Sequence, residues 1–202
     1  MKLPAATSGS FEKCPAGNHL AVCYEVVEMG TQEGGVFGPK HQIWIGWETP
    51  NETMEDGRPF VIGKRYNLSM NEKATLRLHL ESWRGKKFTD ADLGESGSFE
   101  IQNLIGKACF LNVVHTEKED RVYANINAVA PLPKGVESPE LTNERIFVAL
   151  NKEEFVQEDF DKLSERMQEL IQETDEYRAL KGRPKVVVPD NDSGTDDGDI
   201  PF

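Results

Sequence analysis

The sequence has 202 residues, which suits one domain with an appendage or two small domains. Hydrophobic residues make up 38% of it, and no apolar run approaches the roughly 18 residues that a membrane-spanning helix needs. The first residues lack the apolar segment of a secretory signal, so we expect a cytoplasmic protein. Three cysteines without C-x-x-C spacing predict neither a disulfide scaffold nor a zinc module, and we expect no metal and no other cofactor.

Charge is distributed unevenly along the chain. The net charge of −12, taken alone, argues against a nucleic-acid partner, because phosphates attract positive charge. Residues 1–150 carry 16 basic and 20 acidic side chains, whereas residues 151–202 carry 7 and 15. Between Arg58 and Lys87 the balance reverses, with eight Lys and Arg against two Glu. An acidic protein therefore contains one basic segment.

Three segments with alternating polar and apolar residues predict the first three strands, at 19–30, 41–48 and 60–69. The apolar side chains that share a face are Leu20, Val22, Tyr24 and Val26 in the first, Ile43, Ile45 and Trp47 in the second, and Phe60, Ile62, Tyr66 and Leu68 in the third. Trp44, Arg65 and Asn67 fall on the opposite face, where they would be neighbours if the second and third strands pair.

The period then changes to that of a helix. Ser69 or Asn71 is a possible cap, the apolar positions Leu76, Leu80 and Trp83 follow, and Gly85 ends the segment. Runs at 107–115 and 120–131 predict a hairpin of two further strands. Three strands, a helix and two strands are the order of an OB-fold, a five-stranded Greek-key barrel, although other small β-barrels also fit. The predicted fold class is therefore mainly β.

Beyond this barrel, residues 155–180 have an apolar stripe that predicts one amphipathic helix, capped at Asp159 and packed on the barrel rather than forming a coiled coil. The last twenty residues are rich in Gly, Pro, Ser and Asp and predict a disordered tail. The expected domains are an N-terminal extension at 1–18, the OB-fold at 19–135, a helical extension at 136–182 and the tail at 183–202.

The chain ends in DDGDIPF, which places three aspartates before an apolar terminal pair. A solubilising tail is the ordinary explanation of such acidity. The ending, however, resembles the acidic tip of the bacterial single-stranded-DNA-binding proteins, which recruits partner proteins. The resemblance implies a partner-binding tail made of Asp196, Asp197, Asp199, Ile200, Pro201 and Phe202.

A second resemblance covers roughly residues 19–135. The block IGKRYNLSMNEKATLRLHLESWRGKKFTDADL, followed by LIGKACFLNVVH and ANINAVAPLPKG, is similar to the phage and prophage family of OB-fold single-stranded-DNA-binding proteins. It implies sequence-independent binding of single-stranded DNA in replication, recombination or repair, in the cytoplasm of a bacterial host. The expected partners are single-stranded DNA and, through the tip, a polymerase, helicase, primase or nuclease, with the chain a monomer or dimer and no membrane contact.

A protein that coats single strands needs cations along the phosphates and aromatic faces on which bases stack. Trp44 is the best stacking candidate, Tyr123 and Phe88 could be exposed or buried, and Trp47 and Trp83 are assigned to the core. The predicted DNA-binding residues are Trp44, Arg58, Lys64, Arg65, Asn67, Arg77, Arg84, Lys86, Lys87, Phe88 and Tyr123.

Two other classes of function remain open. An acidic interaction module or DNA mimic would explain the net charge, but it has no use for the basic segment. An enzyme is not expected, because His19, His41, His79 and His115 are scattered and no nucleophile, phosphate-loop or metal motif appears.

Overall fold

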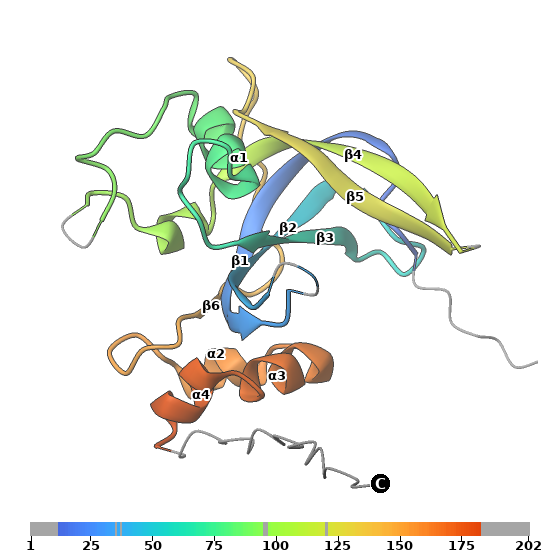
Figure 1. The fold of residues 1–202 in the computed structure, drawn as a ribbon. Helices are drawn as coiled ribbons and strands as arrows, with labels where there is room; N and C mark the ends of the chain where they lie inside the picture. Colours follow the sequence, from blue (N-terminus) through green and yellow to red (C-terminus); the bar gives the residue numbers. More distant parts are fainter. Residues whose placement is uncertain (1–11, 35, 37, 95–96, 120, 183–202) are drawn as a thin grey trace, which may run out of the picture.

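The computed structural model describes residues 12–34, 36, 38–94, 97–119 and 121–182 and is built mainly of strands (Figure 1). The strands are β1 (Gly17–Gln32), β2 (Lys40–Thr53), β3 (Pro59–Asn67), β4 (Ala108–Lys118), β5 (Arg121–Ala130) and β6 (Ile146–Val148). The helices are α1 (Thr75–Arg84), the short 3-10 helix η2 (Ile101–Leu104), α2 (Gln157–Asp161), α3 (Glu165–Gln172) and α4 (Asp175–Leu180). Each described helix falls short of the length and apolar character that crossing a membrane requires.

All six strands belong to one sheet. Five of them pair antiparallel in the order β3-β2-β1-β4-β5, and β6 adds to β1 in parallel. The predicted order of three strands, a helix and two strands is confirmed. Figure 1 shows α1 at one end of the sheet and α2, α3 and α4 at the other.

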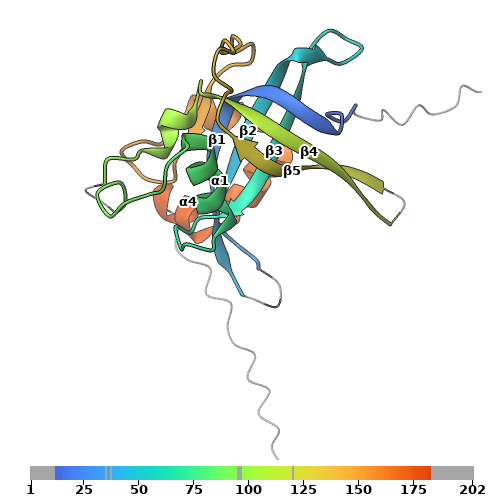
Figure 2. The same ribbon diagram turned by 90° about the horizontal axis from the view of Figure 1, so that it is seen from above.

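The predicted closed barrel is wrong, because the described residues form no ladder between β3 and β5. A side chain bridges the two strands instead, with the Lys64 ammonium donating to the carbonyl of Ile126 over 2.7 Å. Helix α1 packs against both strands and buries Leu76, Leu80 and Trp83 at this opening. The sheet is strongly curled but open on the side where α1 is inserted (Figure 2).

Simple alternation along β1 is also wrong. Ala21 and Cys23 are fully buried, whereas Leu20 and Tyr24 are only half-buried. A β-bulge between Cys23 and Glu25 shifts the register against β2, so the core-facing position passes from odd to even numbers. The same bulge turns the Glu25 side chain toward the outer face of the sheet.

The first core lies between the curled sheet and α1. Trp47 and Trp83 are buried as predicted, with ring centroids 5.8 Å apart, and the Trp83 indole donates to the carbonyl of Ala108 over 2.9 Å. Inward positions of β3 are buried at Ile62 and Tyr66, but the expected Leu68 is 43% exposed because it lies beyond the end of the strand.

The predicted caps of α1 are one turn too early. Ala74 precedes the helix and makes no side-chain cap. Ser69 and Asn71 accept hydrogen bonds within the preceding turn, from the N–H groups of Asn71 and Lys73. These side chains stabilise a turn rather than the helix.

A second core joins the C-terminal extension, residues 136–182, to the sheet. Buried side chains of β1 (Val27 and Met29) pack with those of β6 and with Phe160, Ile171 and Tyr177. The packing on the sheet was predicted, but β6 was not, since a three-residue strand carries too little pattern to detect.

The single helix predicted for residues 155–180 is three short helices. Ser164 and Thr174 interrupt it, because each hydroxyl accepts the N–H three residues later and so caps the start of α3 and of α4. Asp159 lies inside α2 and is not a cap. Two hydroxyl side chains within the predicted helix are therefore the boundaries of separate helices.

Candidate nucleic-acid interface

The outer face of β1, β2 and β3 is organised in rows across the strands. Directly paired residues of antiparallel strands point to the same face. The pairings Val27 with Trp44 and Trp44 with Arg65 define one row, called the Trp44 row below. Asn67 pairs with Gln42 in the next row. Arg65 and Asn67 are therefore exposed beside Trp44, as the alternation of β3 predicted.

The neighbouring row has no side chains at two of its three positions, and Trp44 occupies the space. This row is Glu25, Gly46 and Gly63. A Cβ at Gly63 would lie 2.1 Å from Cζ2 of Trp44, so the indole rests directly on the backbone of β3. Any larger residue at Gly63 would displace the ring.

Glu25 fixes the edge of that indole. The Trp44 Nε1–H donates to Oε2 of Glu25 over 2.7 Å, and a Cβ at Gly46 would lie 2.8 Å from the same oxygen. Burial raises the pKa of Glu25, against the effect of hydrogen bonds from Trp44 and Tyr24. Burial also raises the pKa of the Tyr24 phenol, with a further contribution from the Glu25 charge. The ring of Trp44 is thus held in one orientation by packing and by a buried acceptor.

Tyr24, Trp44 and Gly63 belong to a surface groove of about 390 Å³, called the aromatic groove below. It is lined by Glu12, Lys13, Cys14, Tyr24, Trp44, Val61, Ile62, Gly63, Val122, Tyr123 and Ala124. Tyr123 is 46% exposed and Val61 is 47% exposed, so an aromatic ring and an aliphatic side chain of the groove face solvent beside Trp44. Of the two alternatives left open by the sequence for Tyr123, exposed or buried, the structure shows that it is exposed.

Several predicted cations are engaged by other groups of the protein. Lys64 occupies an inward position of β3, and desolvation lowers its pKa. Arg58 forms an ion pair with Asp56 in the turn before β3. Arg77 binds Glu81 over 2.8 Å and also donates to the carbonyl of Met70 over 2.9 Å.

A corner beside α1, made of Arg84, Phe88, Asp92 and Phe99, is likewise internal. The guanidinium of Arg84 lies 4.0 Å from the ring centroid of Phe88 and 5.0 Å from that of Phe99. It also forms an ion pair of 2.9 Å with Asp92, whose pKa is lowered to about 2 by hydrogen bonds from Thr89 and Arg84. Phe88 is 6% exposed, so it is a core ring rather than a stacking platform. We call this cluster the α1 corner.

Lys86 and Lys87 are exposed in the loop that follows α1. None of the residues lining the aromatic groove comes from that loop. The basic segment of the sequence is therefore not one continuous patch. Arg65 lies in the Trp44 row, and Lys73, Lys86 and Lys87 are exposed in the segments before and after α1. The other four cations, Arg58, Lys64, Arg77 and Arg84, bind carboxylates or carbonyl groups of the protein.

Cysteine side chains can serve as nucleophiles and as metal ligands. Cys14, Cys23 and Cys109 are all buried, and burial raises the pKa of Cys14 to about 11. The described residues include no group of three or more His, Cys, Asp or Glu side chains arranged to hold a metal ion.

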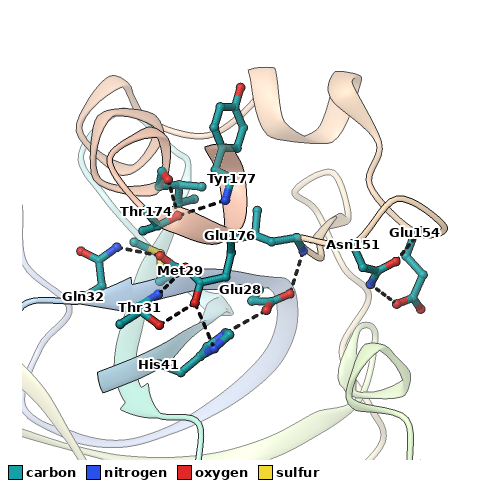
Figure 3. A network of polar contacts seen from close by, with 12 residues as sticks. Glu28, Met29, Thr31, Gln32, His41, Asn151, Glu154, Thr174, Glu176 and Tyr177 are labelled. Atoms are coloured by element: carbon teal, nitrogen blue, oxygen red, sulfur yellow. Dashed lines mark hydrogen bonds and ion pairs between the residues drawn. The ribbon is translucent and has the colours of Figure 1, made fainter. Parts of the chain in front are cut away.

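A polar network fastens the extension to β1 and β2 (Figure 3). The Nε2 atom of His41 lies 2.8 Å from Glu28, and its Nδ1 atom lies 3.6 Å from Glu176 of α4. Glu176 also accepts the N–H of Thr31 over 3.1 Å, and Glu28 accepts the N–H of Leu150 over 2.7 Å. These contacts hold α4, and with it α3, against the sheet.

Sequence reasoning missed four important residues of this face. Glu25 fell on the outward side of the predicted alternation but was not singled out, because no sequence pattern pairs it with the indole of Trp44, and Tyr24 was assigned to the inner face. Gly63 and Val61 were detectable, because they share the outward parity of Arg65 and Asn67 on β3. The tail residues Asp196, Asp197, Asp199, Ile200, Pro201 and Phe202 lie outside the described residues.

Comparison of the whole chain with protein-family models and with curated proteins finds no match.

Proposed function

We propose that this chain is a sequence-independent single-stranded-DNA-binding protein built on a partly open OB-fold. The strand order and the place of α1 between β3 and β4 support the fold, because only the ladder of backbone hydrogen bonds between β3 and β5 is missing from the barrel. In OB-folds the second and third strands form the surface that binds oligonucleotides. The aromatic groove lies against those strands here.

The observation that carries the proposal is the seating of Trp44. Its ring rests on Gly63 and is oriented by Glu25, Tyr123 lines the same groove, and Arg65 is its exposed cross-strand neighbour. Each base stacked on such a ring contributes about 1–3 kcal/mol without regard to sequence, and cations beside it attract the phosphates. The groove has the chemistry of a site for unpaired bases.

In this proposal the protein coats and protects single strands during phage replication or recombination. The acidic tip, residues 196–202, recruits replication or repair proteins by presenting carboxylates and a terminal aromatic residue to a basic pocket. The chain itself performs no chemistry and needs no cofactor.

The test is quenching of tryptophan fluorescence by poly-dT and by a duplex of equal length at several salt concentrations. Because Trp47 and Trp83 are buried, quenching by a bound base reports on Trp44. We expect saturable quenching by the single strand alone, weakening as salt rises, and loss of the signal in Trp44→Phe.

Absence of quenching at low salt would overturn the proposal if it persists after truncation at Pro189, which removes the tail as a competitor for cations. The acidic interaction module would then be the better reading of the chain. Equal affinity for duplex would also contradict it, since stacked and paired bases cannot enter the groove.

A further inference from the structure

The Trp44 row continues from the sheet into the C-terminal extension. At one end of the row Val27 is buried in the second core, and at the other end Arg65 is exposed. Trp44, between them, packs against the same core as Met167 of α3. Helix α3 also contacts β1 directly (Figure 1). The extension therefore borders the face on which Trp44 and Arg65 lie.

Arg166 is the residue of α3 next to Met167, and it is exposed. Arg65 is the cross-strand neighbour of Trp44, and Met167 packs against the same core as Trp44, so Arg65 and Arg166 both lie at the border between the sheet and α3. Desolvation lowers the pKa of Arg65, and the positive charge of Arg166 lowers it further. Within the described part of the chain, neither group has an ion pair or a hydrogen bond. Two like charges held together without a counter-ion cost free energy that an added anion would recover.

From this arrangement we infer that Arg65 and Arg166 together bind one backbone phosphate of the single strand whose base stacks on Trp44. The extension would then be part of the binding surface and not only a cover for β1. Arginine suits this role, since its planar fork donates two hydrogen bonds to a phosphate. The inference rests on the proposed function and adds a second element, α3, to its site.

The experiment is a set of poly-dT titrations of the full chain at several salt concentrations, with Arg65→Ala, Arg166→Ala, the double variant and Arg166→Lys. Loss of one shared phosphate contact should weaken binding on the order of fivefold at low salt and reduce the salt dependence by about one ion released. The double variant should be little weaker than either single variant, because both remove the same contact. Arg166→Lys should restore part of the salt dependence.

Arg178→Ala is the matched control, because this arginine lies in the same extension but is paired with Asp175 at 3.7 Å. Thermal unfolding of each variant separates a loss of folding from a loss of binding, and the midpoint of Arg166→Ala should not fall, because the side chain is exposed and its removal relieves the repulsion with Arg65. If wild-type protein binds and Arg166→Ala binds equally well with the same salt dependence, the inference fails while the proposed function stands. Fully additive effects of the two substitutions would overturn the shared phosphate. Failure of wild-type protein to bind poly-dT would instead refute the proposed function.

Discussion

The aromatic groove and the α1 corner both combine aromatic rings with cations, yet the two regions differ in what those groups contact. In the α1 corner, Arg84 is stacked on two phenylalanine rings and neutralised by Asp92. Along the Trp44 row, Arg65 is exposed and has another cation as its electrostatic neighbour. Positive charge in a sequence therefore predicts an anion site only where the fold leaves that charge without a carboxylate.

The strongest way to break the groove is to fill the space beneath Trp44. Gly63→Ala should displace the indole, because the new Cβ would overlap Cζ2, at a cost of about 2–3 kcal/mol in the free energy of unfolding. Urea denaturation measures the loss, and tryptophan emission should shift as the ring leaves its seat.

The control for Gly63→Ala is the same substitution in a Trp44→Leu background, where no indole remains to be displaced. The cost should fall to within about 1 kcal/mol, because the cycle isolates the contact between the two residues. An equal cost in both backgrounds would show that strand conformation, and not Trp44, requires the glycine.

Besides Trp44, the groove contains Tyr123, whose ring is exposed and can stack on a base. Tyr123→Ala should weaken poly-dT binding by about 5- to 150-fold, the equivalent of about 1–3 kcal/mol of stacking, without changing thermal stability. Tyr123→Phe keeps the ring and should bind almost as well as wild type. If Tyr123→Phe is as weak as Tyr123→Ala, a hydroxyl contact and not stacking would account for the effect.

The converse holds for the α1 corner. Arg84→Ala should lower the free energy of unfolding by about 1–2 kcal/mol, because the stacking on Phe88 and Phe99 is lost. Poly-dT affinity, measured below the unfolding transition, should remain within about twofold of wild type. A large loss of affinity in a folded Arg84→Ala protein would show that the α1 corner also takes part in binding, and would contradict the assignment of Arg84 to the fold alone.

The smallest effect concerns the junction that holds the extension beside the groove, and it depends on pH. The hydrogen bond to Glu28 raises the pKa of His41 above 6.5. The stability that protonated His41 contributes to docking is therefore fully present below pH 6.5 and is lost as pH rises through the raised pKa. Burial would raise the pKa values of Glu28 and Glu176, but hydrogen bonds lower both below 4.5. The stability that these two carboxylates contribute to docking is therefore present above pH 4.5 and is lost as pH falls through their lowered pKa values. Docking of the extension should be strongest from about pH 5 to pH 6.5.

Hydrogen exchange of the α4 amide groups across this pH range measures the docking. Glu176→Gln should reduce protection by about 0.5–1 kcal/mol and flatten its decline above pH 6.5, because His41 then has one acidic neighbour fewer. Asp175→Asn, at the neighbouring position of α4, is the control. If the pH dependence of protection is unchanged in Glu176→Gln, the raised pKa of His41 depends on Glu28 alone.

The sequence predicted correctly those features that follow from a short periodic pattern of polar and apolar residues. Alternation along β2 and β3 separated Trp47 and Tyr66, which are buried, from Arg65 and Asn67, which are exposed. Helical spacing likewise placed Trp83 in the core. Such assignments depend only on neighbours a few residues apart.

What failed depended on partners distant in sequence or on single insertions. Because of the bulge in β1, Ala21 and Cys23 lie in the core, against the predicted alternation, and no local pattern reveals one extra residue in a strand. The internal role of Lys64 depends on Ile126, which lies on another strand. The three C-terminal helices were read as one because hydroxyl side chains that cap a helix also occur inside one.

The short strand β6 has a consequence for how the protein avoids self-association. Strand β4 pairs with β1 only as far as Val22, and β6 takes up the same edge at Glu25, Val26 and Val27. Without β6, residues 25–27 would present unpaired backbone N–H and C=O groups at the edge of the sheet. Sheets of different molecules can pair along such an unprotected edge. The edge strand comes from residues 146–148, more than a hundred positions later, so a growing chain exposes this template until the extension has been made. The extension thus protects this edge of the sheet from self-association once it has been made and has folded.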